Sequence, residues 1–420
     1  RASHTCKMKF LSLALVLVGA AAELTPDIAE NRQHTVTNFT TVKSGALLAS
    51  AFPKAGPTVL LWDTVLTPEK GAPQTQLFFS PSTLLSDDDV DAVTLKIWSE
   101  QDGGVQMLNA HTIRQWGFRS AMFNGDTVHV QVLATKDAGL VYVAIDGAIV
   151  TENTAPDIGS KTLCGRQDTR VRSHPKPDFR YMFSGGCSGG IISIDAEDAC
   201  FMTAGHCGSA QAGRAEFNVP DSQSNGQIVS PGPEDQYPID SSSIQFRNGG
   251  VGNDWKHMGA FPNSNTGRTA FEVQGASHPF LFNPTGIPDG NMIHEGHGVT
   301  VPRAHIHSQT AKGTPGGGTW TRSGNSLRYR FDTTGGDSGS AVRDSEGNYV
   351  GIHTHGGCRP SSPTSGNAGT WYGRQEVQDA VRSPRGICSP EGRAVSKAQR
   401  YGVHFRGDVH AFEGPKVHMG

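Results

Sequence analysis

The strongest constraint on the fold is a repeated pattern of short apolar runs separated by turn residues. In residues 93–98 and 128–132 apolar side chains alternate with polar or amphipathic ones, and Asn124-Gly125-Asp126 precedes the second run. A period of two is typical of half-buried antiparallel strands. The 52 glycines and 24 prolines among 420 residues favour many turns over long helices. The sequence therefore predicts an all-β chain.

The beginning of the chain resembles an export signal. Residues 1–7 precede the first methionine, and residues 8–22 combine a positive start, a short apolar core and an Ala-x-Ala end. This pattern is typical of a secretory signal peptide, and the apolar run is too short to span a bilayer comfortably. The formal net charge of −3 gives no basic excess for nucleic acid. We expect a secreted protein with no nucleic-acid partner and no membrane partner, whose oligomeric state the sequence leaves open.

Pattern and composition divide the remaining chain into four segments. Residues 23–150 predict a β-sandwich-like N-terminal domain or pro-region. Residues 151–186 form a charged, proline-containing linker that is either a processing site releasing a proenzyme or simply an exposed connection. Residues 187–388 contain many short strands with glycine-rich turns, which predicts an all-β barrel or sandwich. Residues 389–420 lack a period and predict a tail.

A serine between glycines is the strongest candidate for a reactive group. Ser338 lies in the stretch Asp332-Thr-Thr-Gly-Gly-Asp-Ser-Gly-Ser-Ala-Val342. Glycines allow a tight turn, at which backbone N–H groups can face the molecule that the hydroxyl attacks. The hydroxyl needs a base, and His206 in Thr203-Ala-Gly-His-Cys207 is the candidate. We expect these two stretches to form one site.

The cysteines and the other histidines indicate disulfides rather than a metal site. Six cysteines follow the signal peptide without a CxxC spacing, so an exported chain predicts three disulfides, with 15 connectivities to choose from. Four histidines lie close together in the sequence, but no spacing completes a ligand set: His294, His297, His305 and His307. We therefore expect no metal and no cofactor.

Both stretches resemble the signature motifs of a known family. Thr203–Cys207 and Gly336-Asp-Ser-Gly-Ser340 are similar to the histidine and serine motifs of chymotrypsin-fold serine proteases. The run beginning at Asp332, followed by Gly351-Ile-His-Thr354, is closer to glutamyl endopeptidases and related exported trypsin-like peptidases. The resemblance covers about residues 164–375. It implies two six-stranded β-barrels with a site between them, and an endopeptidase that cuts proteins or peptides through an acyl-enzyme.

The resemblance also implies residue roles. His206 corresponds to the general base and Ser338 to the nucleophile, and the backbone N–H groups of Gly336 and Ser338 would form the oxyanion hole. Cys187 corresponds to the cysteine that pairs with the one after the histidine, Cys207. For the other four cysteines we expect Cys164–Cys200 and Cys358–Cys388.

The triad acid has two candidates. Asp254 is followed by Trp255, as in the family's acid-bearing strand, and lies 48 residues after His206 (254 − 206), close to the usual spacing. Lys256 and His257 then stand where the family has small or apolar residues. Asp240 precedes an acceptable strand and is the alternative. The spacing favours Asp254. The polar residues after it count against it, because an acid that orients the imidazole needs a well-packed strand, so Asp240 stays the alternative.

The pocket residues imply opposite substrates. Asp332 corresponds to the pocket aspartate of trypsin-like enzymes, which selects Arg or Lys. Thr333 and His353 correspond to the residues with which glutamyl endopeptidases read an acidic side chain. We favour cleavage after Glu or Asp, with trypsin-like cleavage as the alternative.

Two further alternatives stay open. Asp337 either pairs with a new N-terminus after cleavage of a proenzyme or makes a local hydrogen bond that shapes the turn. A catalytically inactive, protease-like binding module is the rival to an enzyme, although such modules usually lose the histidine or the serine, and this chain has both.

Overall fold

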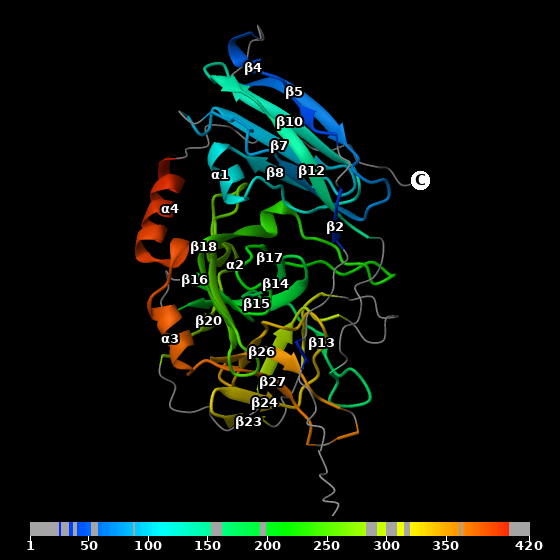
Figure 1. Ribbon diagram of the computed structural model, residues 1–420, viewed down its shortest axis with the longest axis vertical. Helices are drawn as coiled ribbons and strands as arrows, with labels where there is room; N and C mark the ends of the chain where they lie inside the picture. Colours follow the sequence, from blue (N-terminus) through cyan, green and yellow to red (C-terminus); the bar gives the residue numbers. More distant parts are fainter. Residues whose placement is uncertain are drawn as a thin grey trace, which may run out of the picture.

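The computed structural model describes residues 25–26, 33–36, 40–51, 58–86, 89–152, 162–193, 199–282, 292–299, 309–314, 320–359, 361–362 and 364–402. Figure 1 shows an N-terminal β domain at the top, a green barrel below it and a yellow-orange sheet at the bottom. No helix in the described part of the chain is long and apolar enough to cross a membrane. The signal peptide predicted for residues 8–22 lies outside the described residues.

The N-terminal domain is a sandwich of two sheets around one core. The sheets have the strand orders β5-β10-β7-β8 and β2-β12-β6-β9, with β3 also on β12. Every second residue of β7 and β10 is buried, as the alternation predicts, and apolar side chains of both sheets share one core. The bounds are β2 (Gln33–Val36), β3 (Val42–Lys43), β4 (Leu47–Leu48), β5 (Thr58–Leu66), β6 (Gln74–Phe79), β7 (Val93–Ser99), β8 (Val105–Leu108), β9 (Phe123–Asn124), β10 (Val128–Thr135), β11 (Leu140–Val141) and β12 (Ala144–Thr151).

Buried hydrogen bonds join this domain to the first barrel. The side-chain amide of Gln236 accepts from the backbone N–H of Met122 at 2.9 Å and donates to the Met122 carbonyl at 2.8 Å. The amide of Asn124 makes the same reciprocal pair with the backbone of Ser230, at 2.9 Å in both directions. These bonds hold the domain against the barrel, because a buried polar group that loses its partner without gaining water is costly.

The first barrel is closed by six strands. They follow the order β14-β17-β18-β19-β16-β15, and β15 pairs with β14 again, while β20 adds to β15. β14 lies within the predicted linker, residues 151–186, and β15 begins at its last residue. The barrel therefore begins before residue 187. The bounds are β14 (Asp178–Met182), β15 (Gly186–Ser193), β16 (Ala199–Thr203), β17 (Arg214–Glu216), β18 (Gln236–Asn248), β19 (Asp254–Ala260) and β20 (His278–Pro279).

The second sheet is curved but stays open. Its order is β13-β22-β21-β25-β26-β27-β24-β23, and β1 also pairs with β26. A closed barrel followed by an open half-barrel matches the all-β, two-barrel arrangement that the sequence predicts. The bounds are β1 (Thr25–Pro26), β13 (Val171–Arg172), β21 (Ile293–Gly296), β22 (Lys312–Gly313), β23 (Trp320–Ser323), β24 (Ser326–Tyr329), β25 (Ala341–Arg343), β26 (Tyr349–Gly356) and β27 (Asn367–Trp371).

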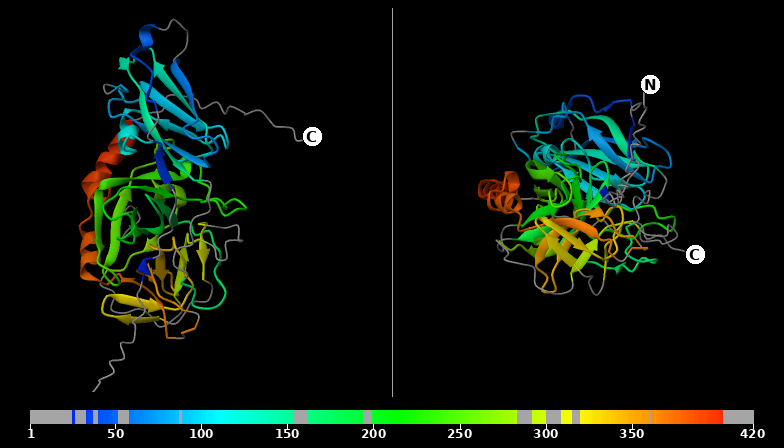
Figure 2. Two further views of the ribbon diagram at one scale, coloured as in Figure 1. Left: turned by 45° about the vertical axis from the view of Figure 1, so that its right-hand side comes forward. Right: turned by 60° about the horizontal axis from the view of Figure 1, so that its bottom comes forward.

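The helices are short and mostly late in the chain. Figure 2 shows α3 and α4 along one side of the molecule in both views. α4 lies where the sequence predicts a tail, so that expectation is wrong for residues 390–402; residues 403–420 lie outside the described part. The disulfide Cys200–Cys388 ties the chain just before α4 to β16. The bounds are α1 (Ala110–Gln115), α2 (Ala270–Gln274), α3 (Gln375–Arg382), α4 (Pro390–Gly402), and the 3₁₀ turns η1 (Ala49–Ala51), η2 (Pro233–Asp235) and η3 (Gly386–Cys388).

Candidate active site

The imidazole of His206 is held by one carboxylate. His206 follows β16, and its Nδ1 lies 2.5 Å from Asp254 Oδ2. The other carboxylate oxygen accepts the backbone N–H of His206 at 3.0 Å. A proton on Nδ1 that is shared with Asp254 leaves Nε2 as the acceptor of the ring. Asp254 thereby fixes the orientation of the ring and the tautomer that can take a proton.

The other edge of the ring faces Ser338. His206 Nε2 lies 2.8 Å from Ser338 Oγ, and this hydroxyl is also 3.3 Å from the carbonyl of Thr354. The three side chains come from three separate places: the turn after β16, the start of β19, and the turn before β25. The structure therefore brings together the histidine, aspartate and serine that the sequence singled out.

Asp240, the alternative acid, serves a different part of the fold. Its Oδ1 accepts from the backbone N–H and the hydroxyl of Ser242, at 2.9 and 2.7 Å. Its Oδ2 accepts the backbone N–H of Ile387 at 2.8 Å, which holds η3 against β18. These contacts give Asp240 a structural role away from the imidazole.

The polar residues after Asp254 are accommodated inside the barrel. Lys256 is buried, and its Nζ donates to Tyr181 Oη at 2.9 Å and to the Gln211 carbonyl at 2.8 Å. Burial lowers the pKa of Lys256 to about 7 and that of His257 to about 4. A polar side chain can lie inside a barrel if it is uncharged or hydrogen-bonded. Lys256 and His257 therefore do not displace Asp254, although the family has small or apolar residues at their positions.

The turn that carries Ser338 is packed tightly against the first barrel. Gly336 and Gly339 have φ of 101° and 89°, in the left-handed region that favours glycine. Ser188 Oγ donates to the Gly336 carbonyl, and Ser188 N donates to the Ser338 carbonyl, both at 2.7 Å. A Cβ at Gly339 would overlap the carbonyl of Ser188. β15 therefore fixes the backbone from which the predicted oxyanion donors, the N–H groups of Gly336 and Ser338, project.

The three predicted pocket residues have different surroundings. Asp332 is buried, and its carboxylate accepts backbone N–H groups from Cys164 at 2.7 Å and Thr169 at 2.8 Å. Thr333 forms an isolated bridge with Thr162, and their hydroxyls lie 2.8 Å apart. Both residues thus hold the segment that precedes the first barrel.

His353 lies on the strand that runs beside the nucleophile turn. Its carbonyl accepts the N–H of Gly339 at 2.7 Å, and its own N–H donates to the Ser340 carbonyl at 3.0 Å. The Tyr329 hydroxyl contacts His353 Nδ1 at 2.7 Å, which fixes the ring. The imidazole is therefore held in place by Tyr329, and the backbone of His353 is bonded to the two residues that follow Ser338.

The disulfides differ in part from the expectation. Cys187–Cys207 joins β15 to the turn of His206, as expected. The other pairs are Cys164–Cys358 and Cys200–Cys388, so the expected Cys164–Cys200 and Cys358–Cys388 are wrong. The sequence could not separate the pairings, because each observed bond joins cysteines 194 or 188 residues apart that only the fold brings together.

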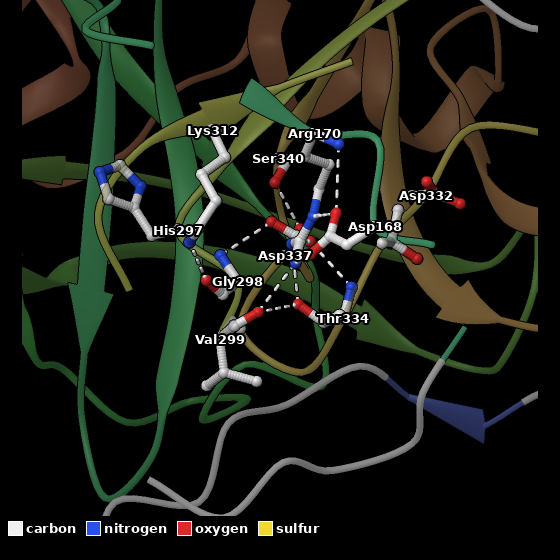
Figure 3. Close-up of polar contacts among 12 residues, drawn as sticks. Asp168, Arg170, His297, Gly298, Val299, Lys312, Asp332, Thr334, Asp337 and Ser340 are labelled. Carbon is white, nitrogen blue, oxygen red and sulfur yellow. Dashed lines mark hydrogen bonds and ion pairs between the residues drawn. The ribbon is translucent and has the colours of Figure 1, made fainter. Parts of the chain in front are cut away.

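Several residues near the site were not found from the sequence. The ring of His355 lies 5.7 Å from that of His206, and its Nδ1 lies 3.9 Å from Asp254 Oδ2. The buried Arg170 contacts Asp337, the residue before Ser338, at 2.6 Å (Figure 3). Arg170 lies in the segment that the sequence predicts to be an exposed linker, and that expectation is wrong for this buried residue. A buried contact between distant segments leaves no signal in local sequence.

The edge of β26 is covered by the beginning of the chain. β1 pairs antiparallel with β26, with Thr25 opposite Gly356 and Pro26 opposite His355. Because the Thr354 carbonyl contacts Ser338 Oγ, this edge lies directly beside the candidate nucleophile. An extended peptide that added a strand here would compete with β1.

The clustered histidines do not assemble a metal site in the described part of the chain. His294 and His297 are buried, and burial lowers the pKa of each to about 3. His305 and His307 lie outside the described residues. The described groups of ligand types are Cys187, His206 and Cys207, and Cys200, His257 and Cys388; all four cysteines are in disulfides.

Comparisons with known proteins give similarity of fold. No protein-family model and no curated protein sequence matches the chain. A solved Glu endopeptidase in complex with MPD is 16% identical, with a TM-score of 0.39 over 53% of this chain and 98% of that one. A thermostable serine protease, AL20, from an extremophilic microorganism is 17% identical, with a TM-score of 0.35 over 48% and 94%. A scabies mite inactivated protease paralogue is 11% identical, with a TM-score of 0.36 over 51% and 97%. These values describe about half the chain, so conclusions on function depend on the geometry of the site.

Proposed function

We propose that the protein is a serine endopeptidase that hydrolyses peptide bonds through an acyl-enzyme. The observation that supports this most directly is the line of contacts from Asp254 through His206 to Ser338, at 2.5 and 2.8 Å. In the proposed reaction Ser338 Oγ attacks the scissile carbonyl while His206 Nε2 takes the hydroxyl proton. His206 then returns the proton to the leaving amine, and water repeats the sequence on the ester.

Backbone and carboxylate provide the charge stabilisation. Asp254 stabilises the imidazolium that forms when His206 is protonated. The N–H groups of Gly336 and Ser338 would stabilise the tetrahedral oxyanion, and one such donor is worth roughly 3–4 kcal/mol where it has been tested. The inactive-module alternative is disfavoured, because His206, Asp254 and Ser338 are all present and in contact.

The substrate preference we propose is for Glu or Asp before the cut. Asp332 is the residue that would select Arg or Lys, yet backbone N–H groups of Cys164 and Thr169 already engage both its oxygens. His353 remains as a rigid imidazole beside the nucleophile turn. An imidazole N–H can donate a hydrogen bond to a carboxylate substrate.

A peptide library tests both parts of this proposal. The full chain is incubated with peptides that carry Glu, Gln, Lys, Arg or Leu before one scissile bond, and products are identified by mass spectrometry. We expect cleavage after Glu in preference to Gln, and little after Lys or Arg. If the folded wild-type protein cleaves none of the peptides, the proposed endopeptidase activity is contradicted. Preferred cleavage after Lys or Arg contradicts only the proposed preference for Glu or Asp.

His353→Leu separates the pocket from the catalytic groups. Loss of a hydrogen bond to a charged partner, worth roughly 1.5–3 kcal/mol, should lower kcat/KM for the Glu peptide about 10- to 100-fold relative to the Gln peptide. The control is Thr321→Val, at an exposed position of β23 in the same sheet, and its Glu/Gln ratio should equal that of wild type. An unchanged ratio in His353→Leu would remove His353 from the pocket.

Because β1 pairs with the edge of β26, we expect the N-terminal segment to compete with extended peptide substrates for this edge. A chain that begins at Arg32 keeps β2 but lacks Thr25 and Pro26. We expect its KM for extended peptides to fall by about 3- to 10-fold, because one or two net hydrogen bonds of roughly 1 kcal/mol no longer have to be displaced. kcat should stay the same. Equal KM values for the two chains would show that β1 does not block the docking edge.

A further inference from the structure

A buried cation lies against the residue next to the proposed nucleophile. Arg170 precedes β13, and its side chain has no exposed surface. Its Nη1 donates to Asp337 Oδ2 at 2.6 Å and to Thr334 Oγ1 at 2.8 Å (Figure 3). Asp337 is equally buried. A charged pair is thus buried directly behind Ser338.

Every N–H of the guanidinium has an acceptor. Besides the two Nη1 bonds, Nη2 donates to Asp168 Oδ2 at 2.7 Å and to the Val299 carbonyl at 2.8 Å, and Nε donates to Asp168 Oδ1 at 2.9 Å. Arginine has five N–H groups in a fixed planar fork, and here all five are used. This complete set marks Arg170 as a built part of the site.

The carboxylate of Asp337 is also fully engaged. Its Oδ1 accepts the N–H of Gly298 at 2.8 Å, and its Oδ2 accepts the N–H of Thr334 at 2.9 Å in addition to Arg170. A Cβ at Gly298 would overlap Asp337, Arg170 and Thr334. A new N-terminal ammonium could reach Asp337 only by displacing the guanidinium.

Asp337 is charged in this arrangement. Burial by itself would raise its pKa, but the charge of Arg170 opposes this most strongly and holds the pKa of Asp337 below its usual value. His294, His297, His353, Lys312 and Asp168 also interact electrostatically with this carboxylate, and Asp168 acts on Arg170 as well. The pair is therefore ionic.

The ion pair shapes the turn of the candidate oxyanion hole. Asp337 N donates to the Thr334 carbonyl at 3.0 Å, and Val299 N donates to the Gly335 carbonyl at 2.9 Å. Arg170 contacts Thr334, Val299 and Asp337 together, so it holds both sides of this turn. The backbone of Gly336 and Ser338 lies within it.

We propose that Arg170 is a positioning residue that holds the oxyanion turn in its active shape in the uncleaved chain. The proposal rests on the proposed endopeptidase function and deepens it. Arg170 would do what a new N-terminus does in proenzymes that are activated by cleavage, so no cut within residues 151–186 is needed. A cut between Arg170 and β14 would instead break the chain that connects Arg170 to the first barrel.

Substitution of Arg170 tests the positioning role, with Arg172→Met as the matched control. Arg172 is also an arginine in an ion pair, with Asp221 at 2.6 Å, but its side chain is 44% exposed. We expect Arg170→Met to lower kcat roughly 10²–10³-fold, the cost of losing an oxyanion donor, with little change in KM. Arg170→Lys should recover part of the loss, because an ammonium can still neutralise Asp337. Arg172→Met should match wild type in kcat.

The fold of each variant is checked by thermal unfolding. If Arg170→Met does not fold, Asp337→Asn replaces it, because this change keeps the shape but removes the charge, and it should give a similar loss of kcat. A folded Arg170→Met or Asp337→Asn with wild-type kcat overturns the proposal.

The state of the active chain is tested separately. A fluorophosphonate probe is reacted with wild type and with the double variant Arg166→Gln/Arg172→Gln, and the mass of each labelled chain is measured. We expect label on chains that are intact through residues 151–186. Label that appears only on chains beginning within this segment overturns the proposal but leaves the endopeptidase function standing. No label on any folded chain overturns both.

Discussion

Replacing Ser338 with alanine is expected to lower kcat for peptide hydrolysis by about 10⁶-fold, the loss typical of removing a triad nucleophile. The remaining rate would come from substrate binding and the oxyanion turn, which do not need the hydroxyl. Ser338 Oγ contacts His206 and the Thr354 carbonyl, so its removal deletes a polar contact without creating a large cavity. The unfolding temperature should therefore change little while kcat collapses.

The matched control for this variant is Ser241→Ala. Ser241 is exposed on β18 in the same barrel, and we expect its kcat to equal that of wild type. Rates are measured with the peptide that the library identifies as the best substrate. A Ser338→Ala chain that keeps wild-type kcat would mean that another group attacks the substrate.

Asp254→Asn is expected to lower kcat by about 10⁴-fold while leaving the fold intact. The amide fills the same space, but it presents an N–H₂ group as well as an oxygen to His206 and can favour the wrong tautomer of the ring. It also removes the negative charge that would stabilise the imidazolium. KM should change far less than kcat, because Asp254 is buried behind His206.

Asp240→Asn distinguishes the two aspartates. Asp240 accepts from Ser242 and from the backbone of Ile387, so its loss should loosen η3 and lower the unfolding temperature. The kcat of Asp240→Asn should remain close to that of wild type. The reverse pattern, with a large loss in Asp240→Asn and none in Asp254→Asn, would assign the acid to Asp240.

The sequence predicts those parts of the fold that local pattern encodes. Period-two alternation in residues 93–98 and 128–132 predicts β7 and β10, because one face of each strand is buried and the other is not. His206 and Ser338 are also predicted from local sequence, because each lies in a short glycine-containing stretch that resembles a signature motif of serine proteases. These predictions require no knowledge of distant contacts.

The features that the sequence does not predict depend on distant contacts. Arg170 in a linker of polar composition contacts Asp337, 167 residues later, and nothing near it in the sequence indicates burial. The pairing of Cys164 with Cys358 has the same origin. α4 lies next to η3, which a disulfide fixes to β16. Tertiary contacts outweigh local preference in these segments.

The most direct test of the account is to locate a fluorophosphonate adduct by mass spectrometry on the folded wild-type chain. The probe reacts with a serine only where a base activates the hydroxyl. We expect one adduct, on the peptide that contains Ser338, and no adduct in a chain with His206→Ala. An unmodified Ser338 in folded, wild-type protein, or an adduct on a different serine, would contradict it.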